Sequence, residues 1–369
     1  MCGIAGIFHL TGDHDIAPEV ISAMNDRQWH RGPDKGDYHF EPGLALAHRR
    51  LSIIDLEGSP QPMMSACQRA VIVFNGEIYN FKSLHKELSL KGYVFNTHGD
   101  TETILNAYLE WGEDCVHHLR GMFAFAIWDR QKQSLFVARD RLGIKPFYYS
   151  LLDDGHFIFG SELKVLTEHQ RFDKSLRNTT VEDYFSFGYI PEPFTIYQNS
   201  FKLSPGHRFT IRKGDKQLPQ PEEYWDVPTE LDTSMSADEV NEQLVERLKE
   251  AVDIRMVADV PLGSFLSGGV DSSSVVALMS QLQEEAVNTC SIGFDVKEFN
   301  ETEFAQMVAD RYETNHRIEV VDQNDFDLVD KLAALYDEPY ADSSAMPTYR
   351  VCELARKHVT VALSGDGAD

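Results

Sequence analysis

The sequence predicts an α/β protein of two domains, and three observations support that fold class. At 369 residues the chain is long for one domain and comfortable for two. The first two hundred residues show many short strands and few helices, which is typical of packed sheets flanked by helices. From Val260 onward strands and helices alternate, which predicts a parallel sheet covered by helices.

The first half contains several strands and two helices. Apolar runs predict strands at 70–74, 122–128 and 135–138. Apolar residues at spacings of three and four predict helices at 81–91 and 101–111. The first strand is expected to end in a turn at Asn75 and Gly76, and polar residues between the other two strands predict a hairpin.

A change in composition separates the two halves. We expect a first domain at 2–213, a linker at 214–235 and a second domain at 236–369. The second domain opens with a helix, because Ser236 and Glu239 have the spacing of a capping box. Its expected strands are 262–266, 290–294, 318–321 and 359–363. Its further helices are expected at 272–282, 301–311, 326–336 and 349–357.

Charge and cysteine content exclude several classes of protein. The formal net charge of −25 at pH 7 would repel nucleic acid, and no apolar run is long enough for a membrane span. The five cysteines are widely spaced and odd in number, which favours a reducing compartment. No signal peptide is expected, because Cys2 and Gly3 stand where its basic region would lie. We therefore expect a cytoplasmic enzyme.

Cys2 is the strongest candidate for a catalytic residue. Removal of Met1 would place a thiol and a free α-amino group on one residue. The thiolate is a strong nucleophile, and an α-amine that titrates at about pH 8 can serve as its base. The alternative is a small apolar residue at the start of a buried strand.

Two glycine loops in the second half predict a nucleotide site. Residues 267–273 lie between a predicted strand and a predicted helix, where glycines admit a phosphate and the helix N-terminus supplies N–H donors. Asp271 in this loop is a candidate Mg²⁺ ligand. Residues 364–367 follow the last predicted strand, and ligands bind outside the carboxyl ends of parallel strands. The alternative for the first loop is a plain turn with a serine cap.

Polar residues of the first half indicate acyl-transfer chemistry. The arginines within 30–34 and 48–55 suit bidentate binding of a carboxylate, with surface ion pairs as the alternative. Asn75 and Gly76 can form an oxyanion hole instead of a turn. Asp100 is expected at the N-cap of a helix, or in contact with a substrate ammonium group, and the two roles are compatible.

Together these motifs resemble the glutamine-dependent asparagine synthetases. The strings that carry the resemblance stand in that family's order over nearly the whole chain: 2–4, 30–34, 50–53, 75–80, 121–125, 139–143 and 267–273. Residues 336–344 look closest to one subgroup, the exosortase-system-associated amidotransferases of polysaccharide gene clusters. The resemblance implies an N-terminal-nucleophile glutaminase with an αββα sandwich, followed by an ATP-pyrophosphatase-type α/β synthetase domain.

The resemblance also implies site roles. Cys2 would attack glutamine, and Asn75 and Gly76 would stabilise the oxyanion. Glutamine would be bound by Arg50, Ile54, Glu77 and Asp100. The second domain would use ATP and Mg²⁺ to activate aspartate as β-aspartyl-AMP, with release of pyrophosphate. ATP contacts are implied for Leu266, Ser267, Gly268, Gly269, Asp271, Ser272, Ile292, Ser364 and Gly365. Asp366 matches an acidic position linked to the acyl-adenylate step.

Two alternatives to this reading stay open. One is amidation of a different carboxylate, on a polysaccharide or a peptide. The other is a non-catalytic homologue that binds glutamine or nucleotide. A homodimer is compatible with the resemblance. The chain stops in a glycine loop where the family continues, so we expect a longer protein whose further residues complete the synthetase site.

Overall fold

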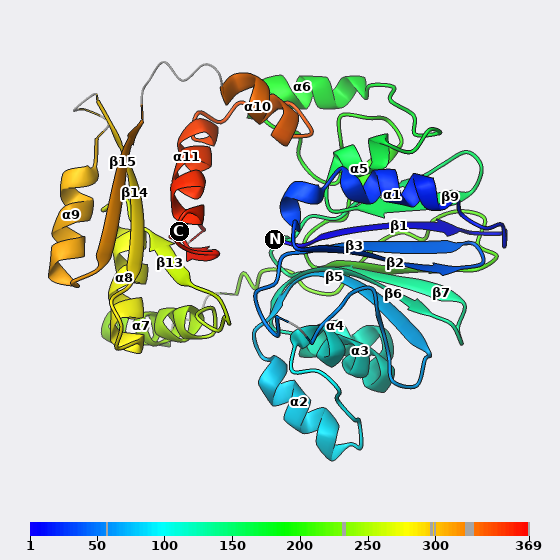
Figure 1. Ribbon diagram of the computed structural model, residues 1–369, viewed down its shortest axis with the longest axis horizontal. Helices are drawn as coiled ribbons and strands as arrows, with labels where there is room; N and C mark the ends of the chain where they lie inside the picture. Colours follow the sequence, from blue (N-terminus) through cyan, green and yellow to red (C-terminus); the bar gives the residue numbers. More distant parts are fainter. Residues whose placement is uncertain (57, 231–233, 296–297, 299, 322–327, 368–369) are drawn as a thin grey trace. The chain divides into compact units, whose positions relative to one another are not determined.

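The computed structural model describes residues 1–56, 58–230, 234–295, 298, 300–321 and 328–367. Contacts divide the chain into two compact units (Figure 1). The first unit contains Met1–Pro228 and Tyr336–Ala341, and the second contains Thr229–Leu335 and Asp342–Asp369. Among the described residues, no helix is both long enough and apolar enough to cross a membrane.

Two antiparallel sheets form the centre of the first unit. The first sheet has the order β10-β8-β9-β1-β3-β2, and its strands are β1 Gly3–His9, β2 Lys35–Glu41, β3 Leu44–Arg50, β8 Tyr148–Leu151, β9 His156–Gly160 and β10 Ser200–Lys202. The second has the order β12-β11-β7-β6-β5-β4, and its strands are β4 Met63–Met64, β5 Ala70–Ile78, β6 Gly121–Asp129, β7 Ser134–Arg139, β11 His207–Arg212 and β12 Glu222–Glu223.

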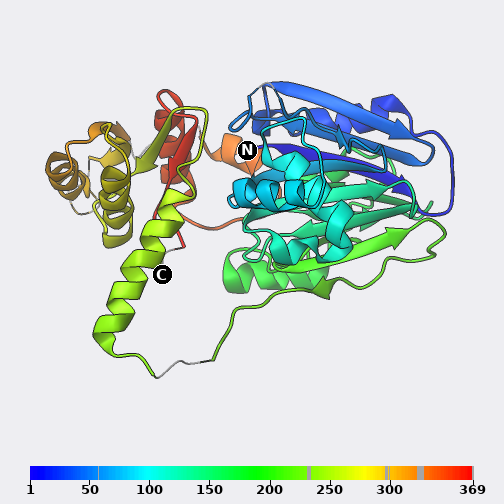
Figure 2. The same cartoon turned by 90° about the horizontal axis from the view of Figure 1, so that it is seen from below.

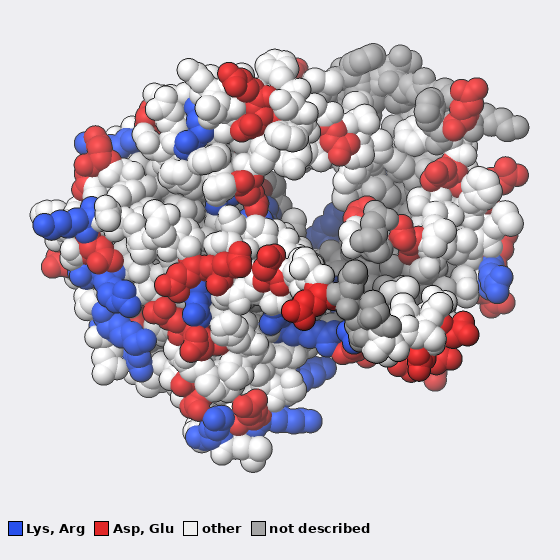
Figure 3. All heavy atoms as spheres, turned by 180° about the vertical axis from the view of Figure 1, so that it is seen from behind, with Lys and Arg blue, Asp and Glu red and all other residues white. Residues whose placement is uncertain are grey.

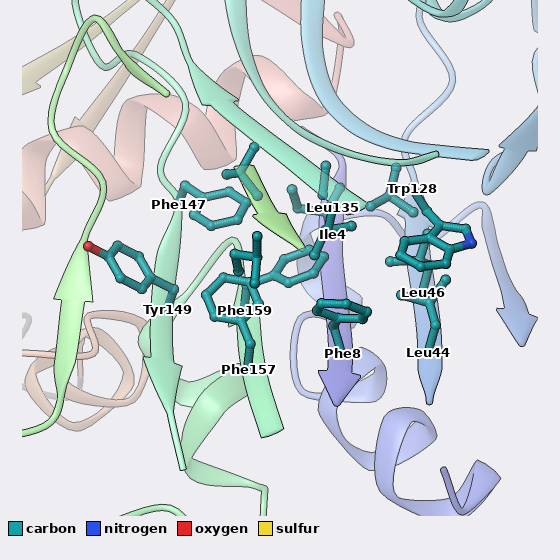
Figure 4. Packing of buried hydrophobic residues seen from close by; sticks show 14 of the residues in the cluster. Ile4, Phe8, Leu44, Leu46, Trp128, Leu135, Phe147, Tyr149, Phe157 and Phe159 are labelled. Atoms are coloured by element: carbon teal, nitrogen blue, oxygen red, sulfur yellow. The ribbon is translucent and has the colours of Figure 1, made fainter. Parts of the chain in front are cut away.

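The inner faces of the two sheets pack against each other. Strand periodicity sends alternate side chains to opposite faces, so Ile4 and Phe8 of β1 point inward with Leu44 and Leu46 of β3. They meet residues of the second sheet such as Trp128 (Figure 4). These side chains are almost fully buried, and the loss of apolar surface from water stabilises the sandwich.

Helices cover the outer faces of both sheets. Those that follow the strands of the first sheet are α1 Pro18–Asp26, α5 Leu163–Thr167 and α6 Asn178–Phe187, with the short 3₁₀ helix η1 Trp29–Arg31. Those beside the second sheet are α2 Phe81–Leu90, α3 Asp100–Trp111 and α4 Cys115–His118, with the 3₁₀ helix η2 Gly112–Asp114. The layers therefore run helix, sheet, sheet, helix, which confirms the expected αββα sandwich.

One turn expected in the first half is absent among the described residues. The predicted turn at Asn75 and Gly76 does not exist, because β5 continues through both residues and pairs Asn75 with Ala124 and Gly76 with Phe123. The other strands and helices predicted in this half are present, including the hairpin of β6 and β7. Residues 222–223 lie within the range expected as a linker and form β12, which pairs with β11.

The second unit is built on a parallel sheet of order β15-β14-β13-β16. Its strands are β13 Leu262–Phe265, β14 Asn288–Phe294, β15 Asn315–Val321 and β16 Val361–Leu363. Its helices are α7 Ala237–Asp253, α8 Val270–Leu282, α9 Thr302–Arg311, α10 Leu328–Leu335 and α11 Ala345–Arg356. Helices α8 and α9 pack on one face and α11 on the other (Figures 1 and 2). The predicted parallel sheet covered by helices is confirmed.

Local signals located the elements of this unit. The capping box at the start of α7 is present: Ser236 Oγ accepts from the backbone N–H of Glu239 at 3.4 Å, and the Glu239 carboxylate accepts from Ser236 N at 2.8 Å. Helix α11 begins at Ala345 and not at 349, because a proline such as Pro347 is tolerated in the first turn. The helix expected at 326–336 corresponds to α10, and 326 and 327 lie outside the described residues.

The surface is strongly acidic in composition but mixed in pattern. Figure 3 shows acidic side chains interspersed with lysine and arginine over the face that it draws. Several of these charges form ion pairs, such as Arg171 with Asp153 and Lys91 with Glu110. At these exposed positions such pairs contribute little to stability, and the net charge of −25 chiefly favours solubility.

Candidate active site

Cys2 lies immediately before β1. It is next to Leu51, the first residue after β3. In the antiparallel ladder Gly3 pairs with Arg49, so Cys2 comes level with Arg50. The thiol donates to the main-chain oxygen of Leu51 at 3.6 Å and accepts from the N–H of Leu51 at 3.5 Å. The start of β1 and the residue after β3, two neighbouring interior strands, therefore fix the position of the candidate nucleophile.

Arg31 and Asn75 both meet the main-chain carbonyl of Cys2. Arg31, the last residue of η1, donates from Nε to the Cys2 oxygen at 2.9 Å. With its amide nitrogen turned toward Cys2, Asn75 donates to the same oxygen at 3.1 Å and accepts from Arg31 Nη2 at 3.3 Å. Arg31 also donates to Glu162 Oε1 at 3.0 Å. A buried network thus orients the nucleophile and the candidate oxyanion donor together.

Gly76 has no room for a side chain. A Cβ at this position would lie 2.1 Å from the carbonyl oxygen of Met122 and 2.8 Å from the Cα of Phe123, both on the neighbouring strand β6. Because the obstructing atoms belong to the backbone, they cannot move aside without breaking the ladder. Glycine is therefore required beside Asn75, and its main-chain N–H is the second candidate oxyanion donor.

Asp100 is buried at the start of α3. Its carboxylate accepts from the main-chain N–H of Ile78 in β5 at 2.9 Å. The expectation that Asp100 occupies the N-cap is wrong: Gly99 is the N-cap residue and Asp100 is the first residue of the helix. This shift places the carboxylate against β5, two residues beyond Gly76, because the helix N-terminus abuts that strand.

The chain that follows β3 holds the candidate binder of the substrate carboxylate. Arg50 is buried, and its Nη2 donates to the main-chain oxygen of Asp55 at 2.6 Å. Asp55 is in turn held by Ser59, whose Oγ donates to its carboxylate at 2.8 Å, and by the N–H of His98 at 3.1 Å. Ile54 is half-buried in the same loop.

The charges around the thiol follow from burial. Burial raises the pKa of Cys2, and the hydrogen bond from Leu51 and the positive charges of the N-terminus and Lys145 oppose that rise. Burial also raises the pKa of Asp100 to about 7, opposed by the N–H of Ile78 and reinforced by the negative charge of Glu77. Two candidate site groups therefore titrate away from their usual range, as is common in active sites.

Lys145 is a buried cation near the same site. Its Nζ lies 3.2 Å from the sulfur of Met1, and burial lowers its pKa while the charges of Glu77, Asp140 and Cys2 raise it. The sequence pattern offers Arg31 as a carboxylate binder, and its guanidinium contacts the carboxylate of Glu162 and the carbonyl of Cys2. No sequence pattern points to Lys145.

The two glycine loops of the second unit line one cavity of about 440 Å³. The sequence-predicted residues that line it are Leu266, Ser267, Gly269, Asp271, Ser272, Ile292, Ser364, Gly365 and Asp366. Gly268 lies between two of them, with a φ of +88° that favours glycine. A Cβ there would also lie 2.6 Å from the Cβ of Phe304, so the loop is pressed against α9.

Hydrogen bonds shape both loops. Ser267 Oγ and Ser272 Oγ lie 2.9 Å apart, and the N–H of Gly269 donates to Ser267 Oγ at 3.2 Å. Ser364 Oγ donates to Asp366 at 2.8 Å. A Cβ on Gly365 would lie 2.7 Å from the N of Ser272 and 2.8 Å from the Cβ of Asp271, so the loops are in close contact. The N-terminus of α8 opens into this cavity, a setting that suits phosphate.

Three carboxylates, Asp271, Glu301 and Asp366, line the same cavity. Within the described part of the chain, no group of three acidic, histidine or cysteine side chains is arranged to hold a metal ion. Mg²⁺ in nucleotide sites takes one or two carboxylates and completes its shell with phosphate oxygens and water. The donor set therefore fits a metal that is held jointly with a nucleotide.

Both units match known family models. Residues 1–225 match the glutamine amidotransferase domain, and residues 243–369 match asparagine synthase. A Methanocaldococcus jannaschii protein, provisionally named asparagine synthetase 2 (glutamine-hydrolyzing), is 41% identical over the whole chain, which covers 74% of that relative. The chain belongs to the glutamine-hydrolysing asparagine synthetases.

Proteins of this family from Bacillus subtilis are also similar to the chain. The asparagine synthetases (glutamine-hydrolyzing) 1 and 3 of that organism are 38% and 33% identical to the whole of this chain. The chain spans 58% and 62% of their respective lengths. The resemblance to the family that the motifs indicated is therefore correct.

Proposed function

We propose that this asparagine synthetase hydrolyses glutamine at Cys2 and passes the ammonia to an ATP-activated carboxylate. Aspartate is the proposed acceptor and asparagine the product, with AMP and pyrophosphate released. The observation that carries the proposal is the meeting of Cys2, Arg31 and Asn75 at the end of β1, next to Gly76. The two loops around one cavity in the second unit support the ATP-dependent half.

Hydrolysis begins once Met1 is removed and Cys2 carries the free α-amine. The amine takes the thiol proton, and Sγ forms a bond with the carboxamide carbon of glutamine. The amide of Asn75 and the N–H of Gly76 stabilise the negative oxygen of the tetrahedral intermediate. When the intermediate collapses, the C–N bond breaks and the proton leaves with ammonia. Water then attacks the thioester, releases glutamate and restores the thiol.

The α-carboxylate and the α-ammonium of glutamine need a positive and a negative binding partner, respectively. Arg50 supplies a planar donor pair for the α-carboxylate. Glu77 and Asp100 supply negative charge for the α-ammonium, with Ile54 beside them. These residues come from β3, β5, α3 and the loop after β3; Arg50 comes level with Cys2 across the ladder, and Asp100 contacts β5 at Ile78.

In the second unit ATP activates the acceptor. Ser267, Gly268, Gly269 and Ser272 hold the pyrophosphate through hydroxyl and main-chain N–H donors at the N-terminus of α8. Leu266, Ile292, Ser364 and Gly365 contact the nucleoside part. Asp271 would hold Mg²⁺, whose charge offsets that of the phosphates when it is bound. Asp366 serves the acyl-adenylate step.

The proposed function is tested by an acceptor screen on the purified full-length protein. Glutamine, ATP and Mg²⁺ are supplied with aspartate or with one of a panel of other carboxylates, and pyrophosphate and the amide product are measured. The panel includes acidic polysaccharides and peptides, because residues 336–344 resemble the exosortase-associated subgroup. We expect an amide product, asparagine, only when aspartate is supplied. Pyrophosphate release and an amide product with a different carboxylate would identify that carboxylate as the acceptor in place of aspartate. If no carboxylate gives pyrophosphate, the ligase assignment is refuted.

Glutamine binding is expected to weaken as the pH falls through about 7. The pKa of Asp100 is raised to about 7, so the carboxyl loses its negative charge below that pH and no longer attracts the substrate ammonium. The KM for glutamine should therefore rise toward acid pH. Because the bound ammonium stabilises the ionised carboxylate, the pKa of Asp100 should be lower in the glutamine complex than in the free enzyme. The measurement is KM against pH for wild type and Asp100→Asn. A variant that keeps the wild-type dependence would remove Asp100 from glutamine binding.

A further inference from the structure

The segment Tyr336–Ala341 lies between α10 and α11 in the sequence but packs within the first unit. Two ion pairs anchor it there. Lys164 Nζ lies 3.0 Å from Asp337 Oδ1, and Lys202 Nζ lies 2.6 Å from Glu338 Oε2. All four side chains are about nine-tenths buried, so each pair is shielded from solvent.

The Asp337 pair connects to the nucleophile through charged contacts. Asp337 Oδ2 accepts from the main-chain N–H of Lys164 at 3.0 Å, in the first turn of α5. Lys164 Nζ lies 3.5 Å from Glu162 Oε2. Glu162 Oε1 accepts from Arg31 Nη1 at 3.0 Å, and Arg31 Nε donates to the Cys2 carbonyl at 2.9 Å. The chain of contacts therefore runs from Asp337 to Cys2.

The Glu338 pair has different partners. Lys202 Nζ also donates to the main-chain oxygen of Ile190 at 2.8 Å, and Glu338 Oε1 accepts from the N–H of Ile196 at 2.7 Å. None of these described contacts involves Glu162 or Arg31. The two ion pairs are therefore buried to a similar degree. Among these described contacts, the Lys164–Asp337 pair connects to the network around Cys2 and the Lys202–Glu338 pair does not.

Two cations contact Glu162 on different oxygens, Arg31 at Oε1 and Lys164 at Oε2. Although burial raises its pKa, the hydrogen bond from His30 and the charges of Arg31 and Lys164 lower it to about 2, so this carboxylate stays ionised. Lys164 is nearer to Asp337 than to Glu162. Without the charge of Asp337, the Lys164 ammonium would move closer to Glu162 Oε2, and that attraction would draw the carboxylate away from Arg31.

We propose that Asp337 is a positioning residue for glutamine hydrolysis. By holding Lys164, it leaves Glu162 to fix Arg31, and Arg31 orients the Cys2 carbonyl and the Asn75 amide. This inference rests on the proposed function at Cys2. It assigns a residue from the synthetase half of the sequence to the support of the glutaminase centre.

The test compares Asp337→Asn with the matched control Glu338→Gln in the full chain. Each removes one negative charge from an equally buried pair of the same segment, so both should lower the unfolding temperature by similar amounts. Asp337→Asn should lower the kcat for glutamate release about tenfold or more without raising KM, because misplaced catalytic groups impair chemistry more than binding. Glu338→Gln should keep the wild-type kcat. Equal losses in both variants, or none in Asp337→Asn, would overturn the proposal.

A double variant tests the effect of Lys164 on Glu162. Asp337→Asn with Lys164→Gln removes the attracting cation as well, so its kcat should exceed that of Asp337→Asn alone. Additive losses would overturn the proposed mechanism. Should Asp337→Asn fold poorly, Asp337→Glu keeps the charge that holds Lys164, so its kcat should stay near the wild-type value, and a large loss of kcat there would count against the proposal. Wild type and Cys2→Ala are assayed in parallel: equal glutamate release by these two would refute the glutaminase itself, whereas a fully active Asp337→Asn would refute the positioning role alone.

Discussion

Replacing Cys2 with alanine is expected to abolish glutamine hydrolysis, with a loss of more than ~10³-fold in kcat and no loss of fold. The substitution removes the sulfur that would form the thioester, and no neighbouring group can replace a covalent nucleophile. The thiol is half-buried, and its hydrogen bonds go to the main chain of Leu51. Its removal therefore disturbs little of the packing. The measurement is glutamate release from glutamine, with thermal unfolding as the check on folding.

Cys67→Ala is the matched control for this variant. Cys67 is an exposed cysteine of the same unit, and its thiol lies 3.5 Å from Ser65 Oγ. We expect its glutamate release to equal that of the wild type. In the full-length protein, Cys2→Ala should still form product from free ammonia, because the second unit does not use the thiol. Near-normal glutamate release by Cys2→Ala would overturn the assignment of the nucleophile.

Features that depend on neighbouring residues could be predicted from the sequence. The capping box at Ser236 and the strand–loop–helix pattern around Gly269 are set by local sequence, and both are present. The loops at 267–273 and 364–367 were expected to meet because parallel strands end at one edge of a sheet, and they line one cavity.

Features that depend on distant residues could not be predicted in this way. Asn75 and Gly76 favour a turn locally, but pairing with β6 extends the strand through them. The ion pair between Asp337 and Lys164 could not be predicted from the residues around Asp337. Lys164 lies far away in the sequence, and the pair forms only in the folded unit. The sequence indicates that Arg31 can bind a carboxylate. Its contact with Cys2 could not be predicted, because that contact requires η1 to pack against the start of β1.

Replacing Asn75 with alanine is the second change expected to have a large effect. The amide of Asn75 donates to the main-chain oxygen of Cys2, so this side chain contacts the residue that carries the candidate nucleophile. Loss of one oxyanion donor typically lowers kcat by about 10²–10³-fold. Because the oxyanion exists only in the transition state and the intermediate, the KM for glutamine should change little. The Arg31 guanidinium would also lose the acceptor that Asn75 provides.

Asn80→Ala provides the matched control for this prediction. Asn80 follows β5 a few residues later, and its side chain donates to the His118 carbonyl and accepts from the N–H of Arg120, each at 2.9 Å. Both variants delete a hydrogen-bonded amide near the same strand, so a loss of kcat in Asn75→Ala alone isolates the chemistry from the stability of the strand. Steady-state kinetics and thermal unfolding are measured for both. An Asn75→Ala enzyme that raises KM and keeps the wild-type kcat would place this amide in substrate binding and leave the oxyanion to Gly76.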